Sequence, residues 1–136
     1  NAGQSRILDD HLQLLAGGHS FGGRMTTTAQ SEKPLDEVEG LVLFSFPLHL
    51  PGRPDTKRAE HLADINIPML FLSGTRDELA TLDLLEPTIK RLGKHAKLHL
   101  IDTANHSYKI LKRSRSSDED VFAEMARLVS NWVKIQ

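Results

Sequence analysis

Residues 14–25 read LLAGGHSFGGRM, in which Ser20 stands between Gly18 and Gly22 in the pattern G-x-S-x-G. A serine flanked by small residues, where a strand turns sharply into a helix, is typical of a nucleophile elbow. The helix N-terminus would then favour negative charge developing beside the hydroxyl. The alternative is a glycine-rich turn that lets a strand and a helix pack closely or cradles a phosphate. That alternative lacks a Walker lysine and the dinucleotide spacing G-x-G-x-x-G.

The sequence around this stretch alternates short apolar runs with amphipathic or polar segments, which predicts an α/β fold. Four strands are expected, at Leu12–Ala16, Leu41–Phe46, Pro68–Leu72 and Lys97–Ile101. The two middle runs are almost wholly apolar, as in strands buried on both faces of a parallel sheet. Helices are expected at Gly22–Ser31, Thr56–Ala63 and Leu82–Leu92, the last of these interrupted or kinked at Pro87 and stopped by Gly93.

A final helix is the clearest element of the pattern. Ser117 is expected to cap it, and the acidic residues at 118–120 suit its positive end. One apolar stripe follows at helical spacing, formed by Val121, Phe122, Met125, Leu128, Val129, Trp132 and Val133. The sequence therefore predicts one domain over residues 1–136, a parallel sheet of about four strands with flanking helices.

Composition excludes several classes of function. The chain has 136 residues, a formal net charge of -1 and no cysteine. We therefore expect no nucleic-acid or membrane partner, no disulfide framework and no thiolate metal site. No apolar run has the length of a membrane span, and the N-terminus lacks the pattern of a signal peptide. The absence of cysteine is compatible with a reducing compartment, so we expect a cytoplasmic location. Because the first residue is Asn1 rather than methionine, we also expect truncation or processing upstream.

The nucleophile hypothesis requires an acid and a histidine after later strands. Asp77 follows the predicted strand Pro68–Leu72, and His106 follows Lys97–Ile101. Parallel topology brings the carboxyl ends of these strands to one edge, where an imidazole can accept the serine proton and a carboxylate can orient the imidazole. Taken singly, such an aspartate is more often a turn residue and such a histidine a surface residue. Asp102 is a rival acid, but its place four residues before His106 predicts a local turn role.

These residues carry a resemblance to a known family. The segments GGHSFGGRM, FPLHLPGRPDTKRAEHL, IPMLFLSGTRDEL and ANHSY resemble the C-terminal half of an α/β-hydrolase of the dienelactone-hydrolase-like branch. The resemblance implies that Ser20 is the nucleophile, Asp77 the acid and His106 the base, with the Phe21 N–H as one oxyanion donor and no cofactor. Enzymes of that branch that attack dienelactones use a cysteine nucleophile, whereas this chain has Ser20 at the elbow and no cysteine. We therefore do not expect a dienelactone as the substrate.

The family's fold also has strands and helices upstream of the elbow, and one of their loops supplies a second oxyanion donor. Loss of one such donor typically costs about 10²–10³ in turnover. The chain as given starts close to the elbow, so we expect Leu12–Ala16 to form an open, apolar sheet edge. That edge is expected to pair with a missing N-terminal segment or with a second copy of the chain.

Other polar residues are candidates for a substrate pocket. His19, Arg24 and His49 lie in segments that reach the same sheet edge, although an internal ion pair is the favoured role for Arg24 and a solvated loop suits His49 equally well. His95 and His99 have the spacing of helical metal ligands, but His99 falls in a predicted strand, where residues four apart do not share an ion. No metal site is predicted.

The function expected from the sequence is hydrolysis of a carboxylic ester or related acyl bond in a small-molecule substrate, through a Ser-His-Asp triad and an acyl-enzyme. The alternative is a non-catalytic interaction module with the hydrolase fold, or an inactive fragment. The two differ in whether an oxyanion hole is completed.

Overall fold

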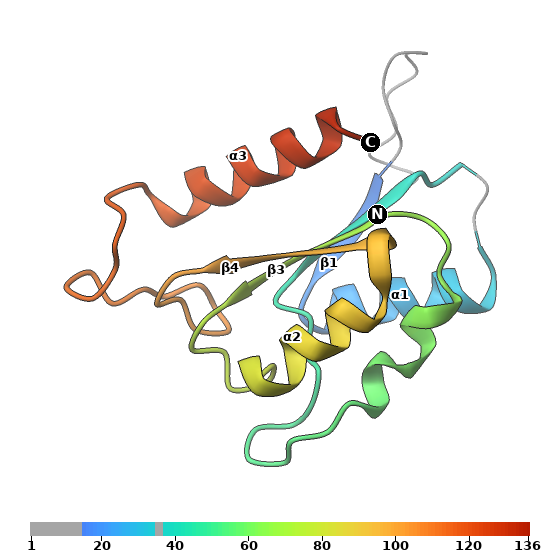
Figure 1. The fold of residues 1–136 in the computed structure, drawn as a ribbon, viewed down its shortest axis with the longest axis horizontal. Coiled ribbons are helices and arrows are strands. Elements are labelled where there is room, and N and C mark those ends of the chain that lie inside the picture. Colours follow the sequence, from blue (N-terminus) through green and yellow to red (C-terminus); the bar gives the residue numbers. More distant parts are fainter. Residues whose placement is uncertain (1–14, 35–36) are drawn as a thin grey trace.

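The fold is built on a parallel sheet in the computed structural model, which describes residues 15–34 and 37–136. Its strand order is β1-β2-β3-β4, and every neighbouring pair runs parallel. The strands are Leu15–His19, Gly40–Phe44, Met69–Gly74 and Ala96–Ile101. The carboxyl ends of all four strands therefore lie at one edge, as the sequence predicted (Figure 1).

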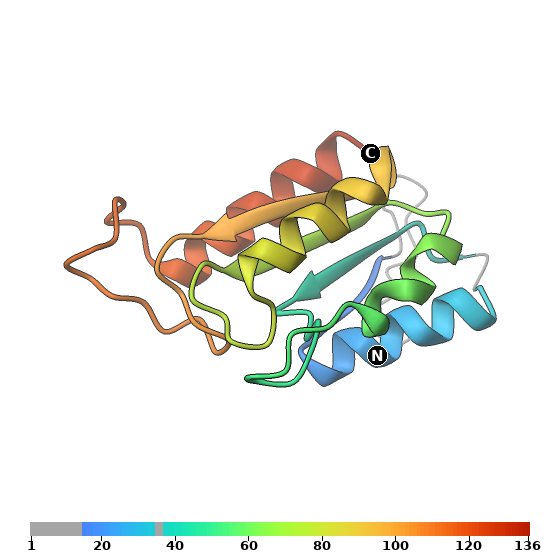
Figure 2. The ribbon, with the colours of Figure 1, turned by 60° about the horizontal axis from the view of Figure 1, so that its bottom comes forward.

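Helices cover both faces of this sheet (Figures 1 and 2). One face carries α1, η1 and α2, and the other carries α3, while the short turn η2 leads into β4. Their bounds are Phe21–Glu32 (α1), Lys57–Asp64 (η1), Leu82–Arg91 (α2), Gly93–His95 (η2) and Val121–Lys134 (α3).

The core forms two clusters, one on each face, because successive side chains of a strand point to opposite faces. Leu43 and Phe71 belong to the cluster under η1 and α2, whereas Leu70 and Leu72 belong to the cluster under α3. The almost wholly apolar strands β2 and β3 thus supply both clusters. This burial on both faces is the reason that their sequences show no alternation.

The first strand differs from its predicted range, Leu12–Ala16. It begins inside that range and continues to His19, and residues 12–14 lie outside the described part of the chain. Gly17 and Gly18 have low strand propensity, yet both pair in register with β2. Pairing with a central strand therefore overrides propensity and carries β1 up to the residue before Ser20.

The other strands shift by one or two residues. The range Leu41–Phe46 is corrected because β2 ends before Ser45, whose φ of 52° leaves the extended region. The range Pro68–Leu72 is corrected because β3 runs on to Gly74, paired with the end of β4. The strand predicted at Lys97–Ile101 begins one residue earlier.

The predicted helices are present with small differences. Thr56–Ala63 forms a 3₁₀ helix, shifted by one residue, rather than an α-helix. Of the two effects expected at Pro87, the interruption is wrong, because α2 runs through this residue. Pro87 and Asp83 are both exposed, so water can bind the Asp83 carbonyl that loses its N–H partner. Gly93, with φ of 74°, ends this helical segment as expected.

The predicted cap of the last helix is also wrong. The Asp120 carboxylate caps α3 by accepting hydrogen bonds from the N–H groups of Phe122 and the residue after it. Ser117 instead accepts a hydrogen bond from the Glu119 N–H in the turn before the helix. Phe122, expected in the apolar stripe, is 63% exposed, whereas Val121 beside it is buried in the core under α3.

Two histidines make stability depend on pH. Burial, followed by the charge of Arg24, lowers the pKa of His61, which shares a hydrogen bond with Thr27. Burial, followed by the charge of Lys97, lowers the pKa of His99. Near pH 6.5 the unfolded chain thus binds more protons than the folded chain, so stability is full above this pH and falls as the pH drops below it.

We therefore expect urea denaturation to give a smaller free energy of unfolding at pH 5.5 than at pH 7.5. The variants His61→Gln and His99→Gln should each reduce this difference. If both variants kept the wild-type difference in the free energy of unfolding between the two pH values, these histidines would not be the source of the pH dependence.

Candidate active site

The turn at Ser20 has the geometry of a nucleophile elbow. Ser20 stands between β1 and α1 with φ of 55° and ψ of −118°. Its N–H donates to the Phe44 carbonyl at 2.8 Å, and its own carbonyl accepts from the Arg24 N–H at 3.1 Å. A residue other than glycine at positive φ stores strain, and such strain is concentrated at functional sites. The elbow thus holds the Ser20 hydroxyl at the carboxyl edge of the sheet.

Close backbone packing explains which glycines this turn requires. A Cβ on Gly18 would lie 2.5 Å from the Gly22 carbonyl carbon and 2.6 Å from the Gly23 nitrogen. A Cβ on Gly23 would lie 2.9 Å from the Gly18 oxygen, whereas one on Gly22 would meet no atom within 4 Å. The steric requirement therefore falls on Gly18 and Gly23. The pattern G-x-S-x-G indicates Gly22 and not Gly23, for which the only signal in the sequence is its place directly after Gly22.

The structure brings Ser20, His106 and Asp77 together. Ser20 Oγ lies 2.6 Å from His106 Nε2, and His106 Nδ1 lies 3.0 and 2.9 Å from the two Asp77 carboxylate oxygens. With a proton on Nδ1, the imidazole donates to Asp77 and accepts from the Ser20 hydroxyl. The Asp77 side chain is fully buried and that of His106 is 21% exposed, so the imidazole lies between the buried carboxylate and the part-buried Ser20 hydroxyl.

Backbone and side-chain contacts fix the acid. The Leu79 N–H donates to Asp77 Oδ1 at 2.8 Å, and the Asp77 N–H donates to the Gly74 carbonyl at 3.2 Å. These bonds hold the carboxylate in a tight turn directly after β3. A carboxylate in this position can keep the imidazole in one tautomer and stabilise its charged form.

Arg76 ties the acid turn to the segment that carries His106. Its Nε donates to the Thr103 carbonyl at 2.7 Å and its Nη2 to the Lys109 carbonyl at 3.2 Å. Thr103 and Lys109 flank His106 along the chain, so one guanidinium joins both sides of the loop. The sequence analysis missed Arg76, whose only signal was its place beside Asp77.

The predicted oxyanion donor, Phe21, is the first residue of α1. Its N–H has no carbonyl partner within the helix, because the first N–H groups of any helix lack one. The group follows Ser20 directly, at the positive end of the helix dipole.

His19 lies beside the three residues. Its ring is 5.9 Å from the rings of both His106 and Tyr108. It helps to line a hollow of about 310 Å³ at the carboxyl edge, on the side of α3, with Phe44, Ser107, Tyr108, Phe122 and Met125. Because His19 and Ser107 lie beside His106, an apolar group of a substrate could lie in this hollow next to the imidazole.

The other two pocket candidates lie elsewhere. His49 is 2% exposed, its Nδ1 donates to the Leu50 carbonyl and its Nε2 bonds Thr81, so both ring nitrogens have protein partners. The expectation that His49 lines a pocket is therefore corrected: it joins two loops. Arg24 lies on α1, close enough to His61 for its charge to lower the pKa of that histidine, and does not line the hollow beside His19.

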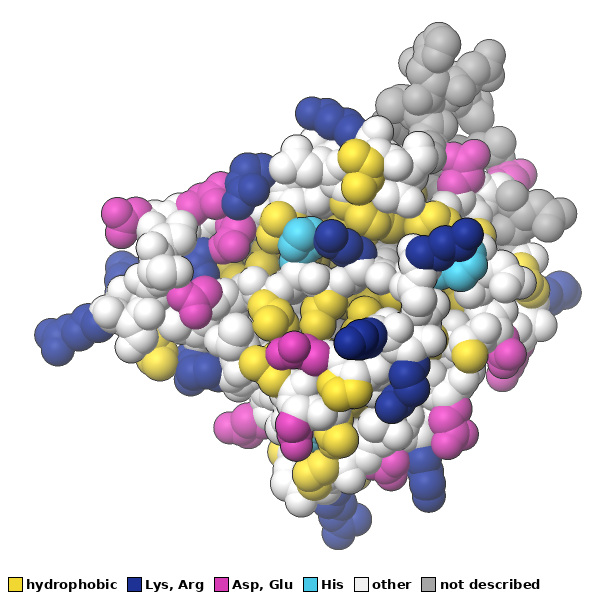
Figure 3. Space-filling model, in the orientation of Figure 1, with side chains coloured by type: hydrophobic (Ala, Val, Ile, Leu, Met, Phe, Trp, Pro, Cys, Tyr) yellow, Lys and Arg dark blue, Asp and Glu magenta, His cyan; other side chains and the backbone are white. Residues whose placement is uncertain are grey.

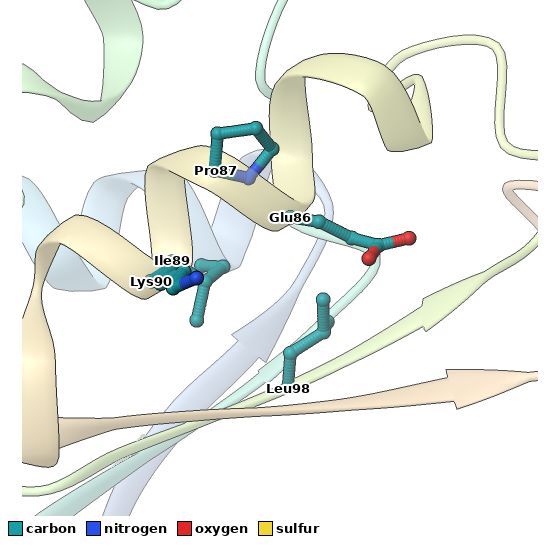
Figure 4. A pocket seen from close by; sticks show the side chains of 5 residues that line it. All are labelled: Glu86, Pro87, Ile89, Lys90 and Leu98. Atoms are coloured by element: carbon teal, nitrogen blue, oxygen red, sulfur yellow. The ribbon is translucent and has the colours of Figure 1, made fainter.

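A second hollow, of about 570 Å³, lies between α2 and β4 and is lined by Glu86, Pro87, Ile89, Lys90 and Leu98 (Figure 4). On this face of the molecule, hydrophobic side chains gather in the middle and charged ones surround them (Figure 3). The lining residues come from the middle and second half of α2 and the middle of β4, and include no hydroxyl or imidazole. This hollow is therefore separate from the chemistry at the carboxyl edge.

Residues 15–34 and 37–136 contain no group of three or more His, Cys, Asp or Glu that could hold a metal ion. Over the same ranges, no helix has the length and apolar character needed to cross a bilayer. Asp102, the rival acid, accepts hydrogen bonds from the Ser116 N–H and hydroxyl.

Comparisons with known proteins agree with this fold. The chain is similar to a predicted CIB-like hydrolase from Thermoplasma acidophilum (TM-score 0.65, 16% identity, covering 91% of this chain and 52% of that one). It is also similar to a monoacylglycerol lipase from Paleococcus ferrophilus (TM-score 0.67, 15% identity, 89% and 68% covered). A third solved structure is the esterase domain of a Rhodothermus marinus protein (TM-score 0.63, 15% identity, 87% and 59% covered).

At these identities the structural likeness shows the fold, and the chain spans about half the length of the first of these structures. A family model described as an alpha/beta hydrolase domain matches residues 3–134. This chain therefore belongs to the alpha/beta hydrolase domain family.

Proposed function

We propose that this protein is a serine hydrolase that cleaves carboxylic esters or related acyl bonds, with Ser20 as nucleophile, His106 as base and Asp77 as acid. One observation carries the proposal: the 2.6 Å contact from Ser20 Oγ to His106 Nε2 continues into the 2.9 Å contact from Nδ1 to Asp77. A neutral imidazole placed in this way converts a weakly nucleophilic hydroxyl into an attacking group.

The reaction follows from the positions of these groups. His106 Nε2 accepts the Ser20 proton as Oγ attacks the carbonyl carbon, and Asp77 stabilises the imidazolium that forms. The oxyanion of the tetrahedral intermediate accepts a hydrogen bond from the Phe21 N–H. Collapse breaks the bond to the alcohol, which leaves with the proton from His106. A water molecule, deprotonated by His106, then attacks the acyl-Ser20 ester and releases the acid.

The hollow beside His19 supports a small organic acyl or alcohol group as the recognised part of the substrate. Its volume of about 310 Å³ is at the lower end of the range for ligand pockets, and Phe44, Tyr108 and Met125 make it largely apolar. Structural neighbours named as a lipase and an esterase support acyl chemistry. The resemblance to the dienelactone-hydrolase-like branch supports placing the protein there, with serine in place of cysteine.

Pre-steady-state hydrolysis of p-nitrophenyl acetate tests the proposal. We expect a burst of p-nitrophenolate approaching one equivalent, followed by slower turnover, because this activated ester acylates the serine faster than water hydrolyses the acyl-enzyme. Ser20→Ala should remove the burst, whereas Ser130→Ala, which changes an exposed serine on α3, should keep it. A burst that persists in Ser20→Ala, or a folded wild-type protein that neither gives a burst nor hydrolyses the ester, would exclude Ser20 as the nucleophile.

A further inference from the structure

Ser45, the first residue after β2, combines backbone strain with complete burial. Its φ is 52°, and none of its surface is exposed. Glycine adopts positive φ without a steric penalty, whereas serine does not. The backbone at this position would thus suit glycine better, so the side-chain hydroxyl is the feature that serine adds here.

The hydroxyl contacts the segment that carries the base. Ser45 Oγ donates to the His106 carbonyl at 2.7 Å, and the Ser45 N–H donates to the Leu72 carbonyl at 2.9 Å. The Leu72 carbonyl also accepts from the Tyr108 hydroxyl at 2.6 Å. The peptide of His106 is thereby joined to the ends of β2 and β3.

The residue before Ser45 contacts the nucleophile. The Phe44 carbonyl accepts from the Ser20 N–H at 2.8 Å. Two adjacent residues at the end of β2 therefore hold both partners of the reacting pair: Phe44 holds the backbone of Ser20, and Ser45 holds the backbone of His106. The 2.6 Å contact between Ser20 Oγ and His106 Nε2 thus joins two segments that both bond to the end of β2.

We propose that Ser45 is a positioning residue, whose hydroxyl fixes the backbone of His106 so that Nε2 faces Ser20 Oγ. This inference rests on the proposed function. His106 lies in the long connection between β4 and α3, and loops of this kind move more than the elements they join. A displacement of about 1 Å at a reacting group can cost about 10²-fold in rate. Loss of the Ser45 hydroxyl should therefore slow attack by Ser20 without changing reagent binding.

The test measures the rate of labelling by a fluorescent fluorophosphonate as a function of its concentration. Ser45→Ala removes the hydroxyl and keeps the strain, whereas Ser45→Gly removes both. We expect both variants to lower the maximal labelling rate by about 10- to 100-fold while the half-saturating concentration stays the same. The melting temperature of Ser45→Gly should stay close to that of the wild type, because relief of strain offsets the lost hydrogen bond.

Ser73→Ala is the matched control. Ser73 is also a buried serine near the end of a central strand, and within the described residues its Oγ has no hydrogen-bond partner. This variant should label at the wild-type rate.

The outcomes separate this inference from the proposed function. A wild-type protein that does not label would overturn both. Normal labelling of Ser45→Gly would show that the hydroxyl is dispensable and would overturn the inference alone. The same conclusion would follow if both Ser45 variants failed to fold, since the residue would then be a determinant of folding, or if they changed only the half-saturating concentration.

Discussion

Replacement of Asp77 with Asn is expected to lower kcat/KM for ester hydrolysis by about 10⁴-fold while the protein stays folded. Both carboxylate oxygens lie within 3.0 Å of His106 Nδ1, and the Asp77 side chain is fully buried. An amide carries no charge to stabilise the imidazolium. Its NH₂ group, if turned toward Nδ1, would favour the tautomer with the proton on Nε2, which cannot accept the Ser20 proton.

Asp102→Asn is the matched control for this prediction. Asp102 stands at the end of β4, near His106 in sequence, but its carboxylate bonds Ser116. We expect this variant to keep kcat/KM within about threefold of the wild type, since surface substitutions away from a site usually have small effects. Comparable losses in both variants, measured on samples with the circular dichroism of the wild type, would exclude Asp77 as the specific acid.

Gly18→Ala is expected to lower the free energy of unfolding by about 3 kcal/mol or more, because a new methyl group would collide with backbone that cannot move aside cheaply. A Cβ there would lie 2.5 and 2.6 Å from backbone atoms of the first turn of α1. The melting temperature should fall by roughly 10 °C or more. Thermal unfolding followed by circular dichroism measures this change.

Gly22→Ala provides the comparison, since a Cβ on Gly22 meets no atom within 4 Å and the residue lies in a helix. Alanine is a better helix former than glycine, so stability should be unchanged or rise by up to about 1 kcal/mol. If the two variants were equally destabilised, close packing at Gly18 would not be the feature that shapes the elbow.

The sequence was sufficient to predict the parallel sheet and the placement of Ser20, Asp77 and His106 at one of its edges. Almost wholly apolar strands indicated burial on both faces, and parallel topology then placed the residues after those strands at one edge. Local detail was less predictable. Both Ser117 and Asp120 lie in the same polar segment and belong to residue types that cap helices well, and it is Asp120 that caps α3.

Residues that act through backbone contacts between distant segments were not predictable. Ser45 and Arg76 contact carbonyl groups of the His106 loop, 61 residues away from Ser45 and 27 and 33 residues away from Arg76. No periodicity or motif marks such a contact, because every residue has a backbone carbonyl whatever its side chain is. His49 shows the converse, since a histidine near the expected site proved to be occupied by protein partners.

The central claim is that His106 activates Ser20 for covalent attack. Intact-mass spectrometry of the folded protein after exposure to a fluorophosphonate, with Ser20→Ala as the control, tests it most directly. The account predicts one phosphonyl group added to the wild-type chain and none added to Ser20→Ala. An unmodified mass for a demonstrably folded wild-type protein, or the same adduct on Ser20→Ala, would contradict it.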